Sequence, residues 1–272
     1  MNARLKNKTF KTGLAVMLAG LFFALLHTSS ESHASDRIPL QSDSVILQQH
    51  IRELKLEYAI EEFSDHSFNA HLTDQQIDSI LREYRIFVNE AVMIYAPDSS
   101  FKIAVLKAER CGAYCVPFWE TWLHFNDGSG MTIKYPGFEN VTSIQKLNDG
   151  KYLVFEDTWS RTGTYGIQHK TATLFSLTDH EIKYFPFPAV PSQSAFENND
   201  AQGSFQVTQF MNADNPELKL NYDTATQQLN YEYVYDDRWN SEEGKLMFYT
   251  GCFLYNAGRF EYKTEAGKQI GE

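Results

Sequence analysis

The sequence is short of cysteine, of positive charge and of the motifs that mark common enzyme classes. It has three cysteines, and no second Cys/His pair has the spacing of a four-ligand zinc site, so we expect no metal and no cofactor. Acidic residues outnumber lysine and arginine by 35 to 24, which makes nucleic acid and anionic membrane surfaces poor partners. A zinc-protease His-Glu-x-x-His, a hydrolase Gly-x-Ser-x-Gly and a Walker loop are also absent.

The one long apolar run lies near the N-terminus. Basic residues precede the apolar stretch 14–26, and small residues follow it at positions 32 and 34, where a signal peptidase would read them. The pattern is typical of a secretory signal, so we expect cleavage of residues 1–34 and export to the periplasm or the exterior. A membrane span needs about 20 apolar residues, so we expect no span after signal removal.

Residues 35–90 are predicted to form a helical region that packs on a sheet domain. From residue 42 to about 53, apolar residues recur at the spacing of one helix face. Residues 54–60 fit that spacing but also alternate, so this part is open to either a helix or a strand.

A second helix has a clearer start. Thr73 and Gln76 have the spacing of a capping box, and Leu72 and Ile77 that of a hydrophobic staple. The apolar pattern that follows predicts a helix that ends near Asn89.

Beyond residue 90 the apolar period changes to two, and one plan repeats three times within 91–272. The units 91–136, 142–186 and 216–264 each read as strand, tight turn, strand, longer loop, strand, short turn and strand. We therefore predict a mainly β fold of four-stranded antiparallel meanders, with either an additional strand near 204–210 or a surface loop there. Each unit has the size of a propeller blade, so the sheets are expected to be propeller-like, to form a sandwich, or to stack irregularly and be closed by the N-terminal helices.

The longer loop of every unit carries an arginine and then an aromatic residue. The pairs are Arg110 with Tyr114, Arg161 with Tyr165, and Arg238 with Trp239. Equivalent loops of stacked meanders emerge at one end, so these residues are the candidate ligand-binding face, with arginine for anions and aromatics for flat groups. The alternative is that the arginines form salt bridges at the rim while the aromatics pack the loops.

Cys111 and Cys115 lie within the first of these loops. In an exported protein we expect them to form a disulfide, with little direct stabilisation because the closed loop is short. The predicted register places Cys252 near the opposite end, as a buried free thiol. A redox pair or a metal clip is the weaker interpretation, because the spacing is Cys-x3-Cys and the context is β.

The function favoured by these patterns is non-catalytic binding of a small molecule, a glycan or an envelope protein. A secreted hydrolase that acts on carbohydrate through Glu156 and Asp236 is the first alternative, because these acids lie at equivalent strand ends. An envelope structural or assembly component is the second.

Overall fold

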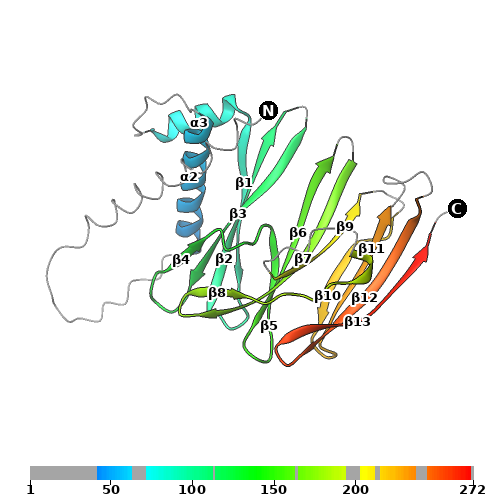
Figure 1. Ribbon diagram of the computed structural model, residues 1–272. Coiled ribbons are helices and arrows are strands. Elements are labelled where there is room, and N and C mark those ends of the chain that lie inside the picture. The colour runs from blue at the N-terminus through cyan, green and yellow to red at the C-terminus, as the bar shows by residue number, and fades with distance from the viewer. Residues whose placement is uncertain are drawn as a thin grey trace, which may run out of the picture. The chain divides into compact units, whose positions relative to one another are not determined.

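The computed structural model describes residues 42–62, 72–112, 114–162, 165–193, 203–211, 215–236 and 244–270 (Figure 1). Helices α2 (Asp43–Glu62) and α3 (Asp74–Glu83) precede three antiparallel sheets. The predicted mainly β fold of repeated four-stranded meanders is confirmed. The expected signal peptide lies outside the described residues.

Each sheet contains four strands that are consecutive in the sequence and pair in chain order. The first sheet consists of β1 (Ile86–Tyr95), β2 (Phe101–Cys111), β3 (Cys115–Phe125) and β4 (Thr132–Lys134). The second consists of β5 (Val141–Lys146), β6 (Tyr152–Thr162), β7 (Tyr165–Thr178) and β8 (Glu181–Tyr184). The third consists of β10 (Lys219–Asp223), β11 (Gln228–Asp236), β12 (Leu246–Asn256) and β13 (Arg259–Gln269).

The additional strand is also present. After the short 3-10 turn η1 (Pro191–Gln193), β9 (Ser204–Phe210) pairs antiparallel with β7, from Thr173 opposite Ser204 to Ile167 opposite Phe210. It therefore extends the second sheet beside the short strand β8. The Gln209 side chain links this strand to the third sheet, because its Oε1 accepts a hydrogen bond from the Val234 backbone N–H at 2.7 Å.

The second helix starts as predicted and ends earlier than predicted. Thr73 and Gln76 make both hydrogen bonds of the capping box. The helix ends at Glu83, and the prediction of an end near Asn89 is wrong. Arg85 adopts a left-handed backbone with φ 54°, and from Ile86 the chain pairs with β2.

Strand alternation explains how the three sheets pack. On the second sheet, Val154 and Phe175 face the first sheet, in a core that also contains Ile103. Their neighbours Leu153 and Leu174 face the third sheet, in a core with residues such as Tyr231 and Phe253. Because the second sheet is buried on both faces, residues 152–155 read as one continuous apolar run.

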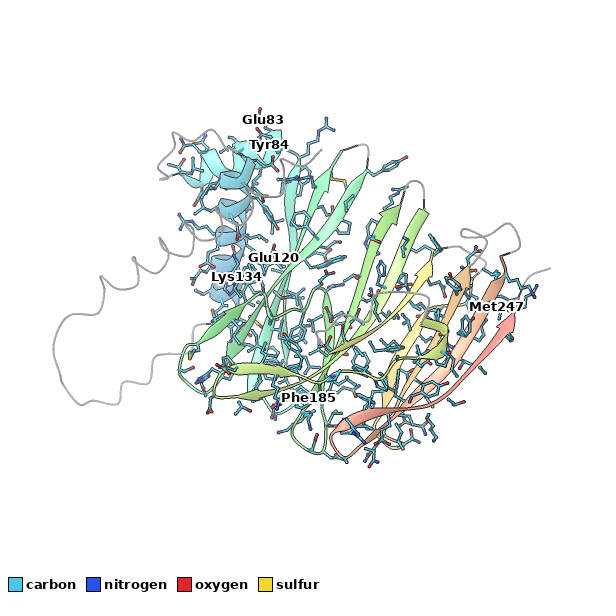
Figure 2. The ribbon with its side chains drawn as sticks, viewed as in Figure 1. Glu83, Tyr84, Glu120, Lys134, Phe185 and Met247 are labelled. Atoms are coloured by element: carbon cyan, nitrogen blue, oxygen red, sulfur yellow. A yellow bond between two sulfur atoms is a disulfide. The ribbon has the colours of Figure 1, made fainter. Side chains whose placement is uncertain are left out.

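The α2 helix covers the face of the first sheet that points away from the second. Leu54 packs there with Leu106 and Trp122. The helix is also bound by polar contacts, since the Tyr58 hydroxyl donates to Glu120 at 2.9 Å and the Lys134 ammonium donates to Glu57 at 2.5 Å. Figure 2 labels Glu120 and Lys134 beside this helix and Phe185 lower in the view. Phe185 packs against the core between the second and third sheets.

In the described part of the chain the sheets follow one another as an open stack, and no barrel closes. The helices cover one end of the stack. No helix among the described residues is long and apolar enough to cross a membrane.

Candidate functional site

The hairpin tips of the first and second sheets meet at one end of the molecule. The β2–β3 and β6–β7 hairpins point the same way, as do the end of β11 and the start of β12 (Figure 1). The Arg161 guanidinium carbon lies 3.8 Å from the centroid of the Tyr114 ring. Two residues of the predicted loop face are therefore in contact, although they belong to different units.

The position of Arg161 follows from β6. Leu153 and Phe155 belong to the core between the second and third sheets, and Arg161 lies farther along the same face of the strand. Strand β5 pairs only with residues 152–156 of β6, so no described strand pairs with the last part of β6 on that side. Arg161 can therefore reach past this edge to the hairpin of the first sheet.

Beside Arg161 lies a cavity of about 390 Å³. It is lined by residues of β6, of β7 and of the segment that follows β9, namely Asp157, Trp159, Arg161, Gly166, Gln168 and Met211. The absence of a side chain at Gly166 makes room for Met211, since a Cβ there would lie 2.8 Å from the methionine sulfur. The volume is within the range of small-molecule sites.

Charge is distributed unevenly around this cavity. The Asp157 carboxylate accepts hydrogen bonds from the Gln168 amide at 3.0 and 3.3 Å, and the Lys170 ammonium lies 3.7 Å away. Arg161 pairs with no carboxylate among the described residues, and its buried Nε has no hydrogen-bond partner there. A buried polar group without a partner costs about 1–3 kcal/mol, so the Arg161 Nε is an unsatisfied donor beside the cavity.

Of the other residues of the predicted face, Arg110 is the one whose side chain the structure describes, and it lies away from this contact. Arg110 forms an ion pair with Glu62 at the end of α2, on the helix side of the first sheet. Tyr165 is the first residue of β7 and pairs with Thr162. Arg238 and Trp239 lie outside the described residues.

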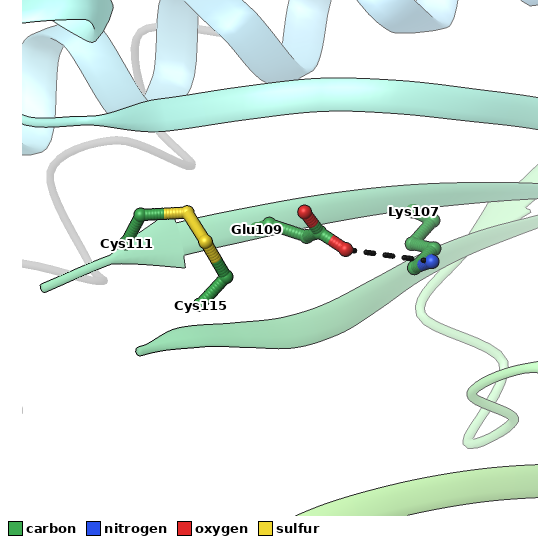
Figure 3. The surroundings of a disulfide bond; sticks show 4 residues. All are labelled: Lys107, Glu109, Cys111 and Cys115. Carbon is green, nitrogen blue, oxygen red and sulfur yellow. Dashed lines mark ion pairs between the residues drawn. A yellow bond between two sulfur atoms is a disulfide. The ribbon is translucent and has the colours of Figure 1, made fainter. Parts of the chain in front are cut away.

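A disulfide joins Cys111 and Cys115, with the two Cα atoms 3.9 Å apart, as the sequence predicts. Cys252 is free and buried, which confirms the second part of that prediction. Figure 3 shows the disulfide beside Glu109, whose carboxylate lies 3.5 Å from the Lys107 ammonium. Glu109 and the two sulfur atoms lie within 4.8 Å of one another, but sulfur atoms bonded to each other offer no thiolate to a metal.

The two carboxylates of the hydrolase alternative are not brought together. Glu156 points toward the first sheet and accepts a hydrogen bond from the Glu139 backbone N–H at 2.6 Å; burial raises its pKa to about 7. Asp236 lies on the face of β11 opposite to Tyr231 and Tyr233, which face the second sheet. The second sheet and the inner face of the third therefore separate them.

Sequence reasoning missed Trp159, Asp157, Gln168 and Met211 as neighbours of Arg161. Alternation along β6 was a usable signal for the first two, since both are an even number of positions from Arg161. Gln168 required the register of β6 against β7, and Met211 required the pairing of β9 with β7, neither of which the sequence revealed.

Comparison with protein-family models, with curated proteins and with solved structures gives no match.

Proposed function

We propose that this protein binds a small organic carboxylate, without catalysis, in the cavity beside Arg161. The observation that carries the proposal is a guanidinium that stacks on Tyr114 while its buried Nε has no partner among the described residues. Arginine binds planar carboxylates through two parallel hydrogen bonds, so a carboxylate would complete the site.

The walls of the cavity indicate the rest of the ligand. Trp159 and Met211 offer apolar surface, which suits a flat or aliphatic body. Asp157 lies four residues before Arg161 on β6, and Gln168 lies two residues after Gly166 on β7. Their side chains already bond each other. A small apolar acid therefore fits better than a sugar. We also propose that the protein is exported, as the N-terminal sequence leads us to expect, so that it binds its ligand outside the cytoplasm.

A thermal-shift and calorimetric assay with benzoate, hexanoate and succinate tests the proposal. We expect at least one of these acids to raise the Tm, because ligand binding stabilises the folded state, and we expect neutral benzamide to have no effect. Arg161→Ala should weaken binding about 10- to 100-fold, the value of a hydrogen bond to a charged group.

Arg259→Ala is the matched control. Arg259 is a surface arginine in the β13 strand, paired with Glu261 at 3.3 Å, and its loss should leave the affinity unchanged. Equal binding by the wild type and by Arg161→Ala, or no binding of any of the acids, would refute the proposal.

A further inference from the structure

Tyr114 and the disulfide belong to the same small loop. The three residues 112–114 connect Cys111 to Cys115, and the loop is closed by a hydrogen bond from the Gly112 N–H to the Tyr114 carbonyl at 2.9 Å. Tyr114 directly precedes Cys115, so the position of its ring over Arg161 depends on where this end of β3 is held.

The disulfide sets that position. The bond joins the two strand ends covalently, with the Cα atoms of Cys111 and Cys115 3.9 Å apart. Without it, only the backbone pairing of β2 with β3 and the hydrogen bond from the Gly112 N–H to the Tyr114 carbonyl would hold this end of β3. Tyr114 would then be free to leave its 3.8 Å contact with Arg161.

We propose that the Cys111–Cys115 disulfide is a redox control of the carboxylate site, which acts by holding Tyr114 against the guanidinium of Arg161. The inference rests on the proposed function for its ligand and on the loop geometry for its mechanism. In the oxidised protein Tyr114 positions Arg161 at the cavity. In the reduced protein the ring leaves the guanidinium, and Arg161 loses its fixed orientation.

The chemical step is a thiol–disulfide exchange with a dithiol. A thiolate of the dithiol attacks one cysteine sulfur, the S–S bond breaks, and the second thiol of the reductant resolves the mixed disulfide. The protein gains two electrons and two protons as two thiols, and the reductant leaves as its own disulfide. Cys115 is exposed at the hairpin tip, so a reductant can reach it.

The fold itself should survive this step. The disulfide closes a ring of only five residues, so its entropic contribution to stability is small. The sheets are held together by the two hydrophobic cores between them. These cores contain many more buried side chains than the end of one hairpin. The reduced state can therefore be compared with the oxidised state in a folded protein.

The Nε–H signal of Arg161 in a nitrogen-15 NMR spectrum reports the stack directly, without any ligand. The signal is identified by its loss in Arg161→Lys. We expect reduction by dithiothreitol, the double variant Cys111→Ser/Cys115→Ser and Tyr114→Ala all to move the signal away from its ring-shifted position. Tyr114→Phe keeps the ring and should keep the signal in place. EDTA is present throughout, so that a metal held by the thiols and Glu109 cannot imitate the effect.

Calorimetry with benzoate then measures the consequence for binding. Reduction and Tyr114→Ala should each lower the affinity about two- to fivefold, the value of one exposed cation–π contact, whereas Tyr114→Phe should not. An Arg161 signal that is the same in both redox states overturns the inference, as does a shifted signal with unchanged affinity. If benzoate fails to bind the oxidised protein, the proposed ligand class is wrong, while the NMR comparison still decides whether the disulfide controls Arg161.

Discussion

Glu156 places an ionisable carboxyl group between the first and second sheets. The side chain is 7% exposed and accepts hydrogen bonds from the Glu139 N–H and the Thr173 hydroxyl. These two bonds favour the charged form, but burial has the larger effect and raises the pKa from 4.5 to about 7. The structure thus assigns this acid a role in pH-dependent stability, on a different face from Arg161.

Replacing Glu156 by glutamine should remove this pH dependence. Between pH 4.5 and pH 7 the folded protein binds the Glu156 proton more tightly than the unfolded chain, so the contribution of Glu156 to stability is lost as the pH rises. The glutamine of Glu156→Gln does not titrate. Between pH 4.5 and pH 8 the free energy of unfolding of this variant should therefore rise by about 3 kcal/mol relative to that of the wild type. Urea unfolding at the two pH values measures the difference.

Glu232→Gln provides the comparison for this experiment. Glu232 is a surface carboxylate paired with Lys219 at 2.8 Å, and its variant should follow the wild type across the pH range. Parallel pH profiles for the wild type and Glu156→Gln would contradict the assigned shift.

At the scale of elements, α2 is attached to the first sheet through a pair of histidines. The Nε2 atoms of His50 and His124 lie 2.8 Å apart, so one ring must donate and the other accept, and both cannot be charged without loss of this bond. His50 also stacks on Trp122, with ring centroids 4.4 Å apart. Burial, followed by the positive charges of His50 and Lys102, lowers the pKa of His124 to about 4.

The attachment of α2 should therefore weaken in acid. Between pH 6.5 and pH 4 the unfolded chain binds a proton at His124 that the folded chain does not, so the contribution of His124 to stability is lost as the pH falls through this window. His124→Gln keeps a side chain that can donate or accept. On acidification from pH 7 to pH 4 the free energy of unfolding of this variant should fall by about 2 kcal/mol less than that of the wild type. The difference is smaller than the whole pKa shift would give, because the His124 ring is partly exposed and solvent screens its charge.

Denaturant unfolding of the two proteins at pH 7 and pH 4 checks this difference. Arg259→Gln, on the third sheet and away from α2, removes no group that titrates in this range; it is the control and should lose as much as the wild type. If His124→Gln is as acid-sensitive as the wild type, the histidine pair does not set the response.

The elements also show how far the sequence could be interpreted alone. The three meanders, β9, the disulfide and the contact partners Tyr114 and Arg161 are predictable, because alternation, turn residues and the repeat are local signals. Local signals do not decide where a helix stops against a strand. The apolar residues 86–88 continue the helical pattern of α3, yet they pair with β2. The ion pair of Arg110 with Glu62 was likewise hidden, because it depends on how α2 lies on the sheet.

At the scale of the whole molecule, aspartates in equivalent turns link each sheet to the next. In the β1–β2 turn, Asp98 accepts hydrogen bonds from Lys146 and Tyr152 of the second sheet, at 2.6 and 2.8 Å. In the β5–β6 turn, Asp149 accepts one from Tyr255 of the third sheet at 2.7 Å. The equivalent Asp223 of the last sheet bonds the Thr226 hydroxyl within its own turn. The repeat thus supplies one link at each of the two junctions.

Removing the tyrosine hydroxyls should test whether the stack unfolds as one unit. Tyr152→Phe and Tyr255→Phe each delete one bond to a carboxylate and should each cost about 1.5 to 3 kcal/mol; Tyr152→Phe also removes the contact with the Ser100 hydroxyl at 2.8 Å. Tyr222→Phe is the control and should cost less than about 0.5 kcal/mol. Tyr222 packs against the core of the second and third sheets, and its hydroxyl makes no hydrogen bond among the described contacts.

Because the two junctions share the second sheet, Tyr152→Phe and Tyr255→Phe should both lower a single unfolding transition, and the stability lost by the double variant should equal the sum of the two single losses. Circular dichroism and tryptophan fluorescence, recorded in the same titration, should then coincide. Two separate transitions, each shifted by only one of the variants, would mean that the sheets unfold independently and that the links are local.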